Sequence, residues 1–330
     1  IDSARETRDH AESGDFQPDL RALTAVNPDS ELIPVTRSNG ILSVLTRPTG
    51  GVIAGQSAVI NLAGWTPKDM AVADPLGLHI ELPGGVPGIG RGSPFGMASR
   101  AVLRRQREAK IKQLREIFGM AVRNPAGNPR LEALAPYARG EKPVIVQASR
   151  REEILEALKL ADELKIKIIL SGGIDAWKVA DEIKKRDIPV ILGPVMSLPY
   201  ESTDPFDAPY TCAAKLHAAG VRFCLRSQGD SNTRNLPYQA AMAVAYGLPP
   251  EEGLRAVTLY PAQILGVADE LGILRAGKRA NLVITNGDIL QATTQVVGSF
   301  IDGKPYAAED KQTRLYERYR ERIREYKSNR

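Results

Sequence analysis

Four side chains with chemically useful groups stand in or directly after short apolar runs of the chain. They are His79, Gln147, Arg226 and Asp230. An imidazole or a carboxylate can move a proton as a general acid or base. A guanidinium pairs with acidic groups, and a primary amide can orient a carbonyl or an amide. We therefore expect a site built from these residues if the apolar runs end at one place in the fold.

Each of these residues also has a structural interpretation. His79 belongs to a site if it points inward and is a hydrogen-bonded surface or helix-facing residue if it points outward. Gln147 either orients a substrate carbonyl or amide or satisfies backbone groups. Asp230 either caps the next helix or acts as general base, and we favour the base. Arg226 either binds an acidic substrate group or forms an internal salt bridge.

A glycine-rich stretch from Gly50 to Ser57 has the glycine spacing of a P-loop, but Gln56 stands where the P-loop has its lysine. Without that positive charge we do not expect phosphate binding. Gln56 and Ser57 are instead predicted to be polar lining of a substrate pocket. Two further histidines, His10 and His217, are interpreted as a solvated and a structural residue, respectively.

The elements that must position these side chains alternate regularly from residue 143 onward. Apolar runs predict strands, and apolar residues at helical spacing between them predict helices. This alternation indicates a parallel sheet with crossover helices. The predicted strands are 41–45, 57–62, 76–82, 144–148, 166–170, 188–192 and 221–225, the last four of them within the alternating part.

Residues 247–288 carry the most specific pattern of the chain. They resemble the C-terminal signature of the amidohydrolase superfamily, in its imidazolonepropionase- and prolidase-like branch. There a last barrel helix runs into T-x-x-P-A-x-x-L-G and then G-x-L-x-x-G-K-x-A-D-L-V. The matching residues are Thr258, Pro261, Ala262, Leu265, Gly266, Gly272, Leu274, Gly277, Lys278, Ala280, Leu282 and Val283. The usual aspartate of this pattern is Asn281 here.

The resemblance implies an α/β fold, a (β/α)8 barrel of the TIM type, with a small β-sandwich beside it. A closed barrel needs eight strands and we predict seven, so the first strand is expected upstream of this chain. The implied domains are 1–265 for the barrel, 266–308 for the C-terminal strands of the composite sandwich and 309–330 for a C-terminal helix.

Members of this superfamily hydrolyse a C–N bond with one or two divalent metals, zinc among them. The resemblance implies ligands at strand ends, and these positions are degenerate here. Gln147 stands in place of a histidine, Gly172 and its neighbours offer no imidazole, and the aspartate position is held by Asp230 or lost at Gln228. No residue is assigned as a metal ligand, and the chain alone is not expected to bind the metal.

Two functional hypotheses follow. The first is an enzyme that hydrolyses an amide, peptide or cyclic amide bond of a small substrate, with Asp230 as catalytic base. The second is a catalytically inert barrel that acts as a binding or structural subunit, in a homo- or hetero-oligomer with an N-terminal fragment or a paralogous subunit. The predicted substrate-binding residues are Gln56, His79, Gln147 and Arg226.

The composition excludes some classes of protein. The net charge is +5, but the basic residues of 100–116 and 309–330 alternate with acidic ones, so we expect solvated helices and no nucleic-acid partner. No apolar run approaches the ~20 residues that a membrane-spanning helix needs. Two cysteines do not make a disulfide framework. The compartment, cytoplasmic or periplasmic and secreted, therefore stays open.

Overall fold

The computed structural model describes residues 14–83, 97–227, 229 and 231–328. Its centre is a six-stranded sheet in the order β2-β5-β6-β7-β8-β9. The strands are β2 (Ile53–Gln56), β5 (Leu78–Glu81), β6 (Val144–Ala148), β7 (Ile168–Gly172), β8 (Val190–Leu192) and β9 (Phe223–Leu225). Strands β5 to β9 run parallel, and β2 joins β5 in the antiparallel direction. Within the described residues, β2 and β9 are the two edges of this sheet, and no ladder joins them.

The parallel strands are buried on both faces, which explains why their sequences are apolar throughout. Successive side chains of a strand point to opposite faces. One set, which includes Val144, Val146 and Leu170, packs in the large core with the helices. The other set, which includes Ile145 and Ile169, packs in a smaller core with Ala262 of α10 and the residues after it. We call this second side the inner face of the sheet.

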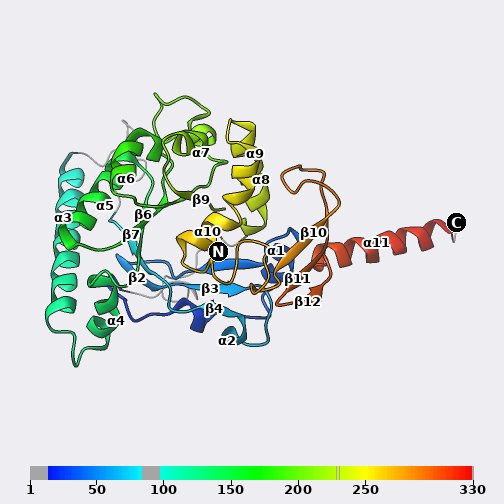
Figure 1. Cartoon of the computed structure of the whole chain (residues 1–330), viewed down its shortest axis with the longest axis horizontal. Helices are drawn as coiled ribbons and strands as arrows, with labels where there is room; N and C mark the ends of the chain where they lie inside the picture. The colour runs from blue at the N-terminus through cyan, green and yellow to red at the C-terminus, as the bar shows by residue number, and fades with distance from the viewer. Residues whose placement is uncertain (1–13, 84–96, 228, 230, 329–330) are drawn as a thin grey trace.

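Helices connect and cover the strands (Figure 1). They are α1 (Leu32–Ser38), α2 (Pro67–Met70), α3 (Met97–Arg123), α4 (Pro129–Ala138), α5 (Arg151–Leu164), α6 (Ala180–Lys185), α7 (Ala208–Ala218), α8 (Leu236–Ala245), α9 (Pro250–Arg255), α10 (Leu259–Ile264) and α11 (Lys311–Ser328). Short 3-10 turns precede α6 and α8, and one lies at Ala22–Ala25. The predicted alternation of strands and helices from 143 onward is confirmed, and the connection between β7 and β8 consists of a 3-10 turn (Ala176–Val179) followed by α6.

Two predicted barrel strands lie elsewhere. The runs 41–45 and 57–62 form β1 (Ser43–Thr46) and β3 (Ala58–Asn61), which pair with β4 (Ala71–Ala73) in a separate antiparallel sheet. The prediction that they belong to the parallel sheet was wrong. The chain leaves that sheet at Ser57, whose N–H donates to the Gly77 carbonyl, and an apolar run does not by itself indicate which sheet it joins.

A third sheet follows the signature stretch. It contains β10 (Leu282–Thr285), β11 (Val296–Ile301) and β12 (Lys304–Tyr306). Strands β11 and β12 form a hairpin, and Asp302 and Gly303 between them have φ values of 50° and 76°, as a type I′ turn requires. Asn281, the residue that departs from the family pattern, links the sheets by donating to Asn61 Oδ1 at 2.8 Å and accepting from the Asp302 N–H at 2.9 Å.

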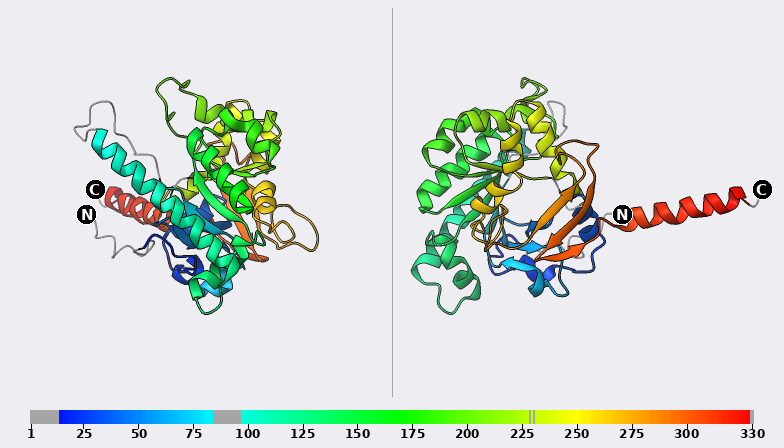
Figure 2. Two further views of the ribbon diagram at one scale, coloured as in Figure 1. Left: turned by 90° about the vertical axis from the view of Figure 1, so that its left-hand side faces the viewer. Right: turned by 45° about the vertical axis from the view of Figure 1, so that its right-hand side comes forward.

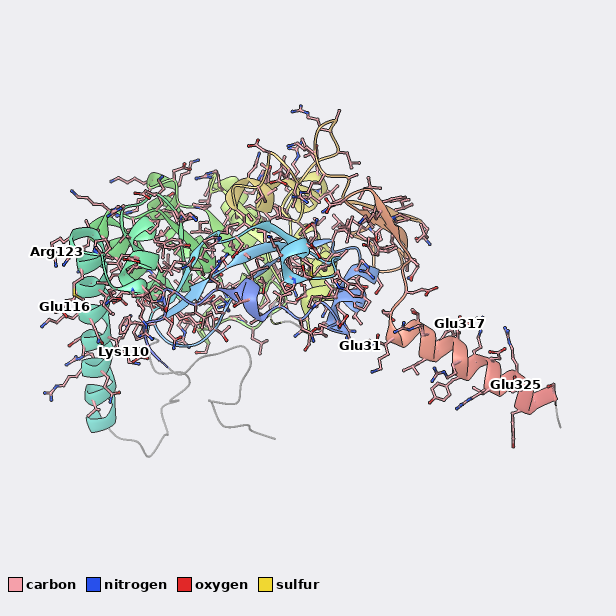
Figure 3. All side chains as sticks on the ribbon, turned by 90° about the horizontal axis from the view of Figure 1, so that it is seen from below. Glu31, Lys110, Glu116, Arg123, Glu317 and Glu325 are labelled. Carbon is pink, nitrogen blue, oxygen red and sulfur yellow. The ribbon has the colours of Figure 1, made fainter. Side chains whose placement is uncertain are left out.

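Helix α11 extends away from the rest of the molecule, as Figure 1 and the right-hand view of Figure 2 show. It has no buried residue, and its side chains, Glu317 and Glu325 among them, point away from the helix axis on all sides (Figure 3). Lys110, Glu116 and Arg123 lie along α3 at the opposite end of the molecule (Figure 3). No helix in the described part of the chain combines the length and the apolar character that crossing a membrane requires.

Candidate functional site at the carboxyl ends of the parallel strands

The carboxyl ends of the parallel strands bring polar side chains together on the inner face. Glu81 of β5 pairs in register with Gln147 of β6, and Gln147 pairs with Ser171 of β7. Gln147 and Ser171 lie two residues after Ile145 and Ile169, so all four point to the same face. One polar row thus crosses three adjacent strands, directly above an apolar layer.

Arg226, which follows β9, reaches across the sheet to this row. Its Nη1 donates to Gln147 Oε1 at 3.2 Å and to Ser171 Oγ at 2.8 Å, and its Nε donates to the Gly193 carbonyl at 3.2 Å. We call Glu81, Gln147, Ser171 and Arg226 the strand-end cluster. Gly193 makes the approach possible, since a Cβ at this position would lie 2.5 Å from the Arg226 carbonyl oxygen.

The guanidinium of Arg226 is largely removed from water. Burial, and in second place the positive charge of Arg47, lower the pKa of Arg226 to about 10. Arg47 itself forms an ion pair with Glu81, with 3.2 Å between Nη1 and Oε1. No carboxylate in the described part of the chain lies within ion-pair distance of Arg226, so its three acceptors are neutral. The cluster therefore holds a buried guanidinium without a direct counterion among the described residues, and the carboxylate of Glu81 acts on it only from beyond ion-pair distance.

His79 lies one layer below the cluster. It pairs in register with Ile145 of the inner face, and its side chain is 4% exposed. Burial lowers the pKa of His79 well below its usual value, and the nearby charges of Arg47 and Arg226 lower it further. Its Nε2 is buried and has no hydrogen-bond partner among the described residues. A neutral imidazole thus forms the floor beneath the strand-end cluster.

Gln56 is not part of this group. Because β2 is antiparallel to β5, Gln56 pairs with Leu78 at the amino end of the parallel sheet, the edge opposite the cluster. Its Nε2 donates to the Pro18 carbonyl at 2.7 Å, and its Oε1 accepts from the Tyr137 hydroxyl at 3.3 Å. Both ends of this buried amide are used inside the protein, so a role in lining the same pocket does not follow from its position.

The remaining candidates divide into two groups. Asp230, Gln228 and His10 lie outside the described residues. The assignment of Asp230 as the catalytic base therefore remains a prediction. His217 lies on α7, with 3.7 Å between its Nδ1 and Glu252 Oε2. Sequence reasoning singled out neither Ser171 nor Arg47 as a functional residue. The spacing 145–147 and 169–171 in paired strands is the signal that identifies Ser171, whereas nothing in the sequence around Arg47 indicates its position.

The donors present do not fit a divalent metal. Among residues 14–83, 97–227, 229 and 231–328, no group of three or more His, Cys, Asp or Glu side chains could hold one. Gln147 is a neutral amide, which transition metals bind poorly, and its oxygen accepts from the Arg226 guanidinium. A second cation at that oxygen would meet the positive charge already there. We therefore derive no step through a metal from these residues.

Comparison with known proteins gives similarities in sequence and in fold. A profile of the amidohydrolase family matches residues 210–307. The amidohydrolase tasK of Hapsidospora irregularis is 33% identical over 93 residues, which are 25% of this chain and 10% of that protein. Imidazolonepropionase of Flavobacterium psychrophilum is 33% identical over 81 residues, 23% of this chain and 20% of the relative. These matches thus span a fifth of the curated relatives' length or less.

The crystal structure of an amidohydrolase from Thermotoga maritima is similar over most of the chain. It superposes with a TM-score of 0.72 at 25% sequence identity, over 90% of this chain and 80% of that one. The signature at residues 258–283, the parallel sheet with its covering helices and the profile match agree with one another. The profile match, the curated relatives and the Thermotoga maritima structure together support the resemblance of this chain to the amidohydrolase superfamily.

Proposed function

We propose that this chain is a ligand-binding member of the superfamily, which holds a small molecule that carries both a carboxylate and an amide. The strand-end cluster is the binding site. In this proposal Arg226 binds the carboxylate, while Gln147 and Ser171 contact the amide group. The function is recognition of the ligand, and the described residues of the cluster do not cleave it.

The charge of Arg226, which has no direct counterion among the described residues, carries the proposal. Its guanidinium is mostly buried, yet among the described residues it donates only to the neutral oxygens of Gln147, Ser171 and Gly193. A buried charge without a counterion is costly, and a carboxylate ligand would offset that cost. A guanidinium also offers parallel N–H groups in a planar fork that matches a carboxylate.

Neighbouring groups favour an acyl compound over a simple anion. The Gln147 Nε2 lies 3.4 Å from Ser149 Oγ, a long contact that a carbonyl oxygen can replace. The hydroxyls of Ser149 and Ser171 donate as well as accept, so both halves of an amide find complementary groups. His79 below remains neutral and adds no second charge to the floor of the site.

Hydrolysis of a C–N bond is the second candidate, and the resemblance to the superfamily favours it. Asp230 is the general base in this candidate, as predicted from the sequence. A full set of metal ligands would have to come in part from residues other than those of the strand-end cluster. The substrate class is the same as above, namely a small amide or peptide, so one set of compounds tests both candidates.

The test uses N-acetyl amino acids and the matching N-acetyl amino acid amides, in which a carboxamide replaces the carboxylate. Calorimetric titration of the intact protein should detect binding of the acids and much weaker binding of the amides. Equal binding of both series, or of neither, contradicts the proposal. Release of acetate, measured with and without added Zn²⁺ or Mn²⁺, decides between the candidates. Turnover supports the hydrolase, and binding without turnover supports the inert barrel.

A subunit role within a larger assembly is the remaining part of the proposal. Light scattering of the full-length protein after size-exclusion chromatography tests it. A mass equal to one chain, at concentrations at which the protein binds its ligand, would contradict a requirement for a second subunit. A stable multiple of that mass would support a homo-oligomer, and a complex formed only after adding a paralogous chain would support a hetero-oligomer.

A further inference from the structure

A cavity of about 330 Å³ lies between α1, the segment that leads from β3 into α2, and β12. It shares no residue with the strand-end cluster, and its walls include Arg37, Trp65, Lys304 and Tyr306. From these residues we propose that the cavity is a second binding site, and that its ligand is a small planar aromatic carboxylate. The volume lies at the lower end of the range of small-molecule sites, about 300–1,000 Å³.

The charge of the cavity indicates an anion. Arg37 Nη1 donates to the Leu62 carbonyl at 2.9 Å, and its guanidinium lies 4.5 Å from the centre of the Tyr306 ring. Its Nε is buried and has no hydrogen-bond partner in the described part of the chain. Neither Arg37 nor the exposed Lys304 is within ion-pair distance of a described carboxylate. An incoming carboxylate would offset both charges.

Two acidic side chains near this cavity have partners other than Arg37 and Lys304. Asp69 and Asp302 line a smaller adjoining cavity of about 200 Å³. Asp69 Oδ2 accepts from the Thr66 N–H at 3.0 Å in the capping box of α2. Asp302 Oδ1 is 3.1 Å from Arg279 Nη1. Neither carboxylate forms an ion pair with Arg37 or Lys304, so these two cations have no direct counterion in the described part of the chain.

The aromatic part of the ligand follows from Trp65. Its side chain is 90% exposed, the highest value of any large apolar side chain in the described part of the chain, and it stands at the edge of both cavities. The backbone holds it there. A Cβ at Gly64 would lie 2.5 Å from Met70 Cγ, so the chain passes close to α2 and turns the indole outward. Trp65 and Tyr306 then offer two ring faces to a planar ligand.

Isothermal titration calorimetry with 2-naphthoate, and with 2-naphthamide as its neutral counterpart, tests the proposal. We expect naphthoate to bind the full chain and naphthamide to bind much more weakly. Arg37→Gln should weaken naphthoate binding about ten- to a hundredfold, the usual effect of losing a hydrogen bond to a charged group. Trp65→Ala should weaken it about tenfold through the lost ring contact. Arg123→Gln, which removes an exposed positive charge from α3, is the matched control and should change nothing.

Since Arg37 also holds the Leu62 carbonyl, its variant is checked for folding by circular dichroism. Lys304→Gln gives an independent test if that variant does not fold, because Lys304 is exposed on β12 and should lower the affinity about threefold by removing one partly screened charge. The proposal is overturned if naphthoate does not bind, if naphthamide binds equally well, or if the folded variants among Arg37→Gln, Trp65→Ala and Lys304→Gln all retain full affinity. The last result would locate binding elsewhere, for instance at the strand-end cluster.

Discussion

Gln56 and Gln147 lie at opposite ends of the parallel strands, the amino end and the carboxyl end, and their surroundings differ. Gln56, at the amino edge, is 6% exposed and joins a backbone carbonyl to a tyrosine hydroxyl. Gln147, at the carboxyl edge, is only half-buried and accepts a hydrogen bond from the charged guanidinium of Arg226. The first ties the segment around Pro18 to the fold. The second lies beside a charge that has no direct counterion among its described neighbours.

The difference shows that residue type alone does not indicate whether a polar side chain stabilises the fold or binds a ligand. What matters is whether its partners within the protein already satisfy it. The amide of Gln56 has internal partners at both ends, whereas that of Gln147 lies beside a charged donor, Arg226, without a direct counterion among the described residues. Four changes test this contrast, and they follow in order of decreasing expected effect.

Arg226→Gln should have the largest effect. We expect the affinity for N-acetyl amino acids to fall by about 2–3 kcal/mol, because a charge-assisted contact to the carboxylate is lost. Arg222→Gln is the matched control at the other end of the same strand, where Arg222 pairs with the exposed Asp187. It should leave the affinity unchanged. If both variants bind N-acetyl amino acids as tightly as the unchanged protein does, Arg226 does not bind the ligand, and the proposed site at the carboxyl ends of the strands is contradicted.

Gln56→Ala should lower stability without affecting binding. It removes the partners of the Pro18 carbonyl and the Tyr137 hydroxyl, and each unsatisfied buried group costs about 1–3 kcal/mol, so we expect the free energy of unfolding to fall by at least about 2 kcal/mol. Urea denaturation measures this loss, and calorimetry measures ligand affinity. Reduced affinity with unchanged stability would show that Gln56 serves a ligand after all.

The pH dependence of stability tests the floor of the cluster. The pKa of His79 is lowered in the folded protein, so below its usual value of 6.5 the unfolded chain binds the proton more tightly. Stability contributed by the neutral imidazole is thus present above pH 6.5 and is lost as the pH falls below it, by up to about 1.4 kcal/mol per pH unit.

His79→Gln should remove the part of the stability loss below pH 6.5 that comes from protonation of His79. The charged side chains that face it, Arg47, Glu81 and Arg226, are unchanged in this variant. Denaturant unfolding of both proteins between pH 5 and 7 gives the comparison, with ~1.4 kcal/mol per pH unit as the largest expected difference in slope. Parallel curves for the two proteins would mean that His79 does not have the lowered pKa that its burial indicates.

Gln147→Ala should have the smallest effect on stability, about 0.5–1 kcal/mol, since Arg226 Nη1 keeps its bond to Ser171. The measurement is again urea denaturation, side by side with Gln56→Ala. A loss as large as that of Gln56→Ala would remove the contrast between the two edges and assign Gln147 to the internal framework.

Much of the fold could be predicted from the sequence. The apolar runs that became β5 to β9, and the helices between them, have clear periodicities, and the rule that parallel strands end at one edge anticipates the approach of Gln147 to the position of Arg226. The runs that became β1 and β3 were assigned to the wrong sheet, because pairing partners depend on tertiary contacts. Gln56 lies at the amino end of the parallel strands because β2 runs antiparallel to β5, and no local sequence pattern predicts that direction.

The site was less predictable than the fold for the same reason. Which oxygens a long side chain such as Arg226 reaches is decided by three strands distant in sequence. The ion pair of Arg47 with Glu81 joins residues that no spacing rule connects. The role of Asp230 is still a prediction, and the distinction between a binding barrel and a hydrolase awaits the titrations proposed above.

Gly172 has a consequence for how this strand end can change. Its φ is +108°, and a Cβ there would lie 2.2 Å from Ser149 Oγ and 2.8 Å from Gln147 Nε2. Any larger residue at this position thus meets both a strained backbone and occupied space. An imidazole introduced here would therefore require Ser149 and Gln147 to move or to change at the same time. Through Gln147, any substitution at this position would also disturb the strand-end cluster.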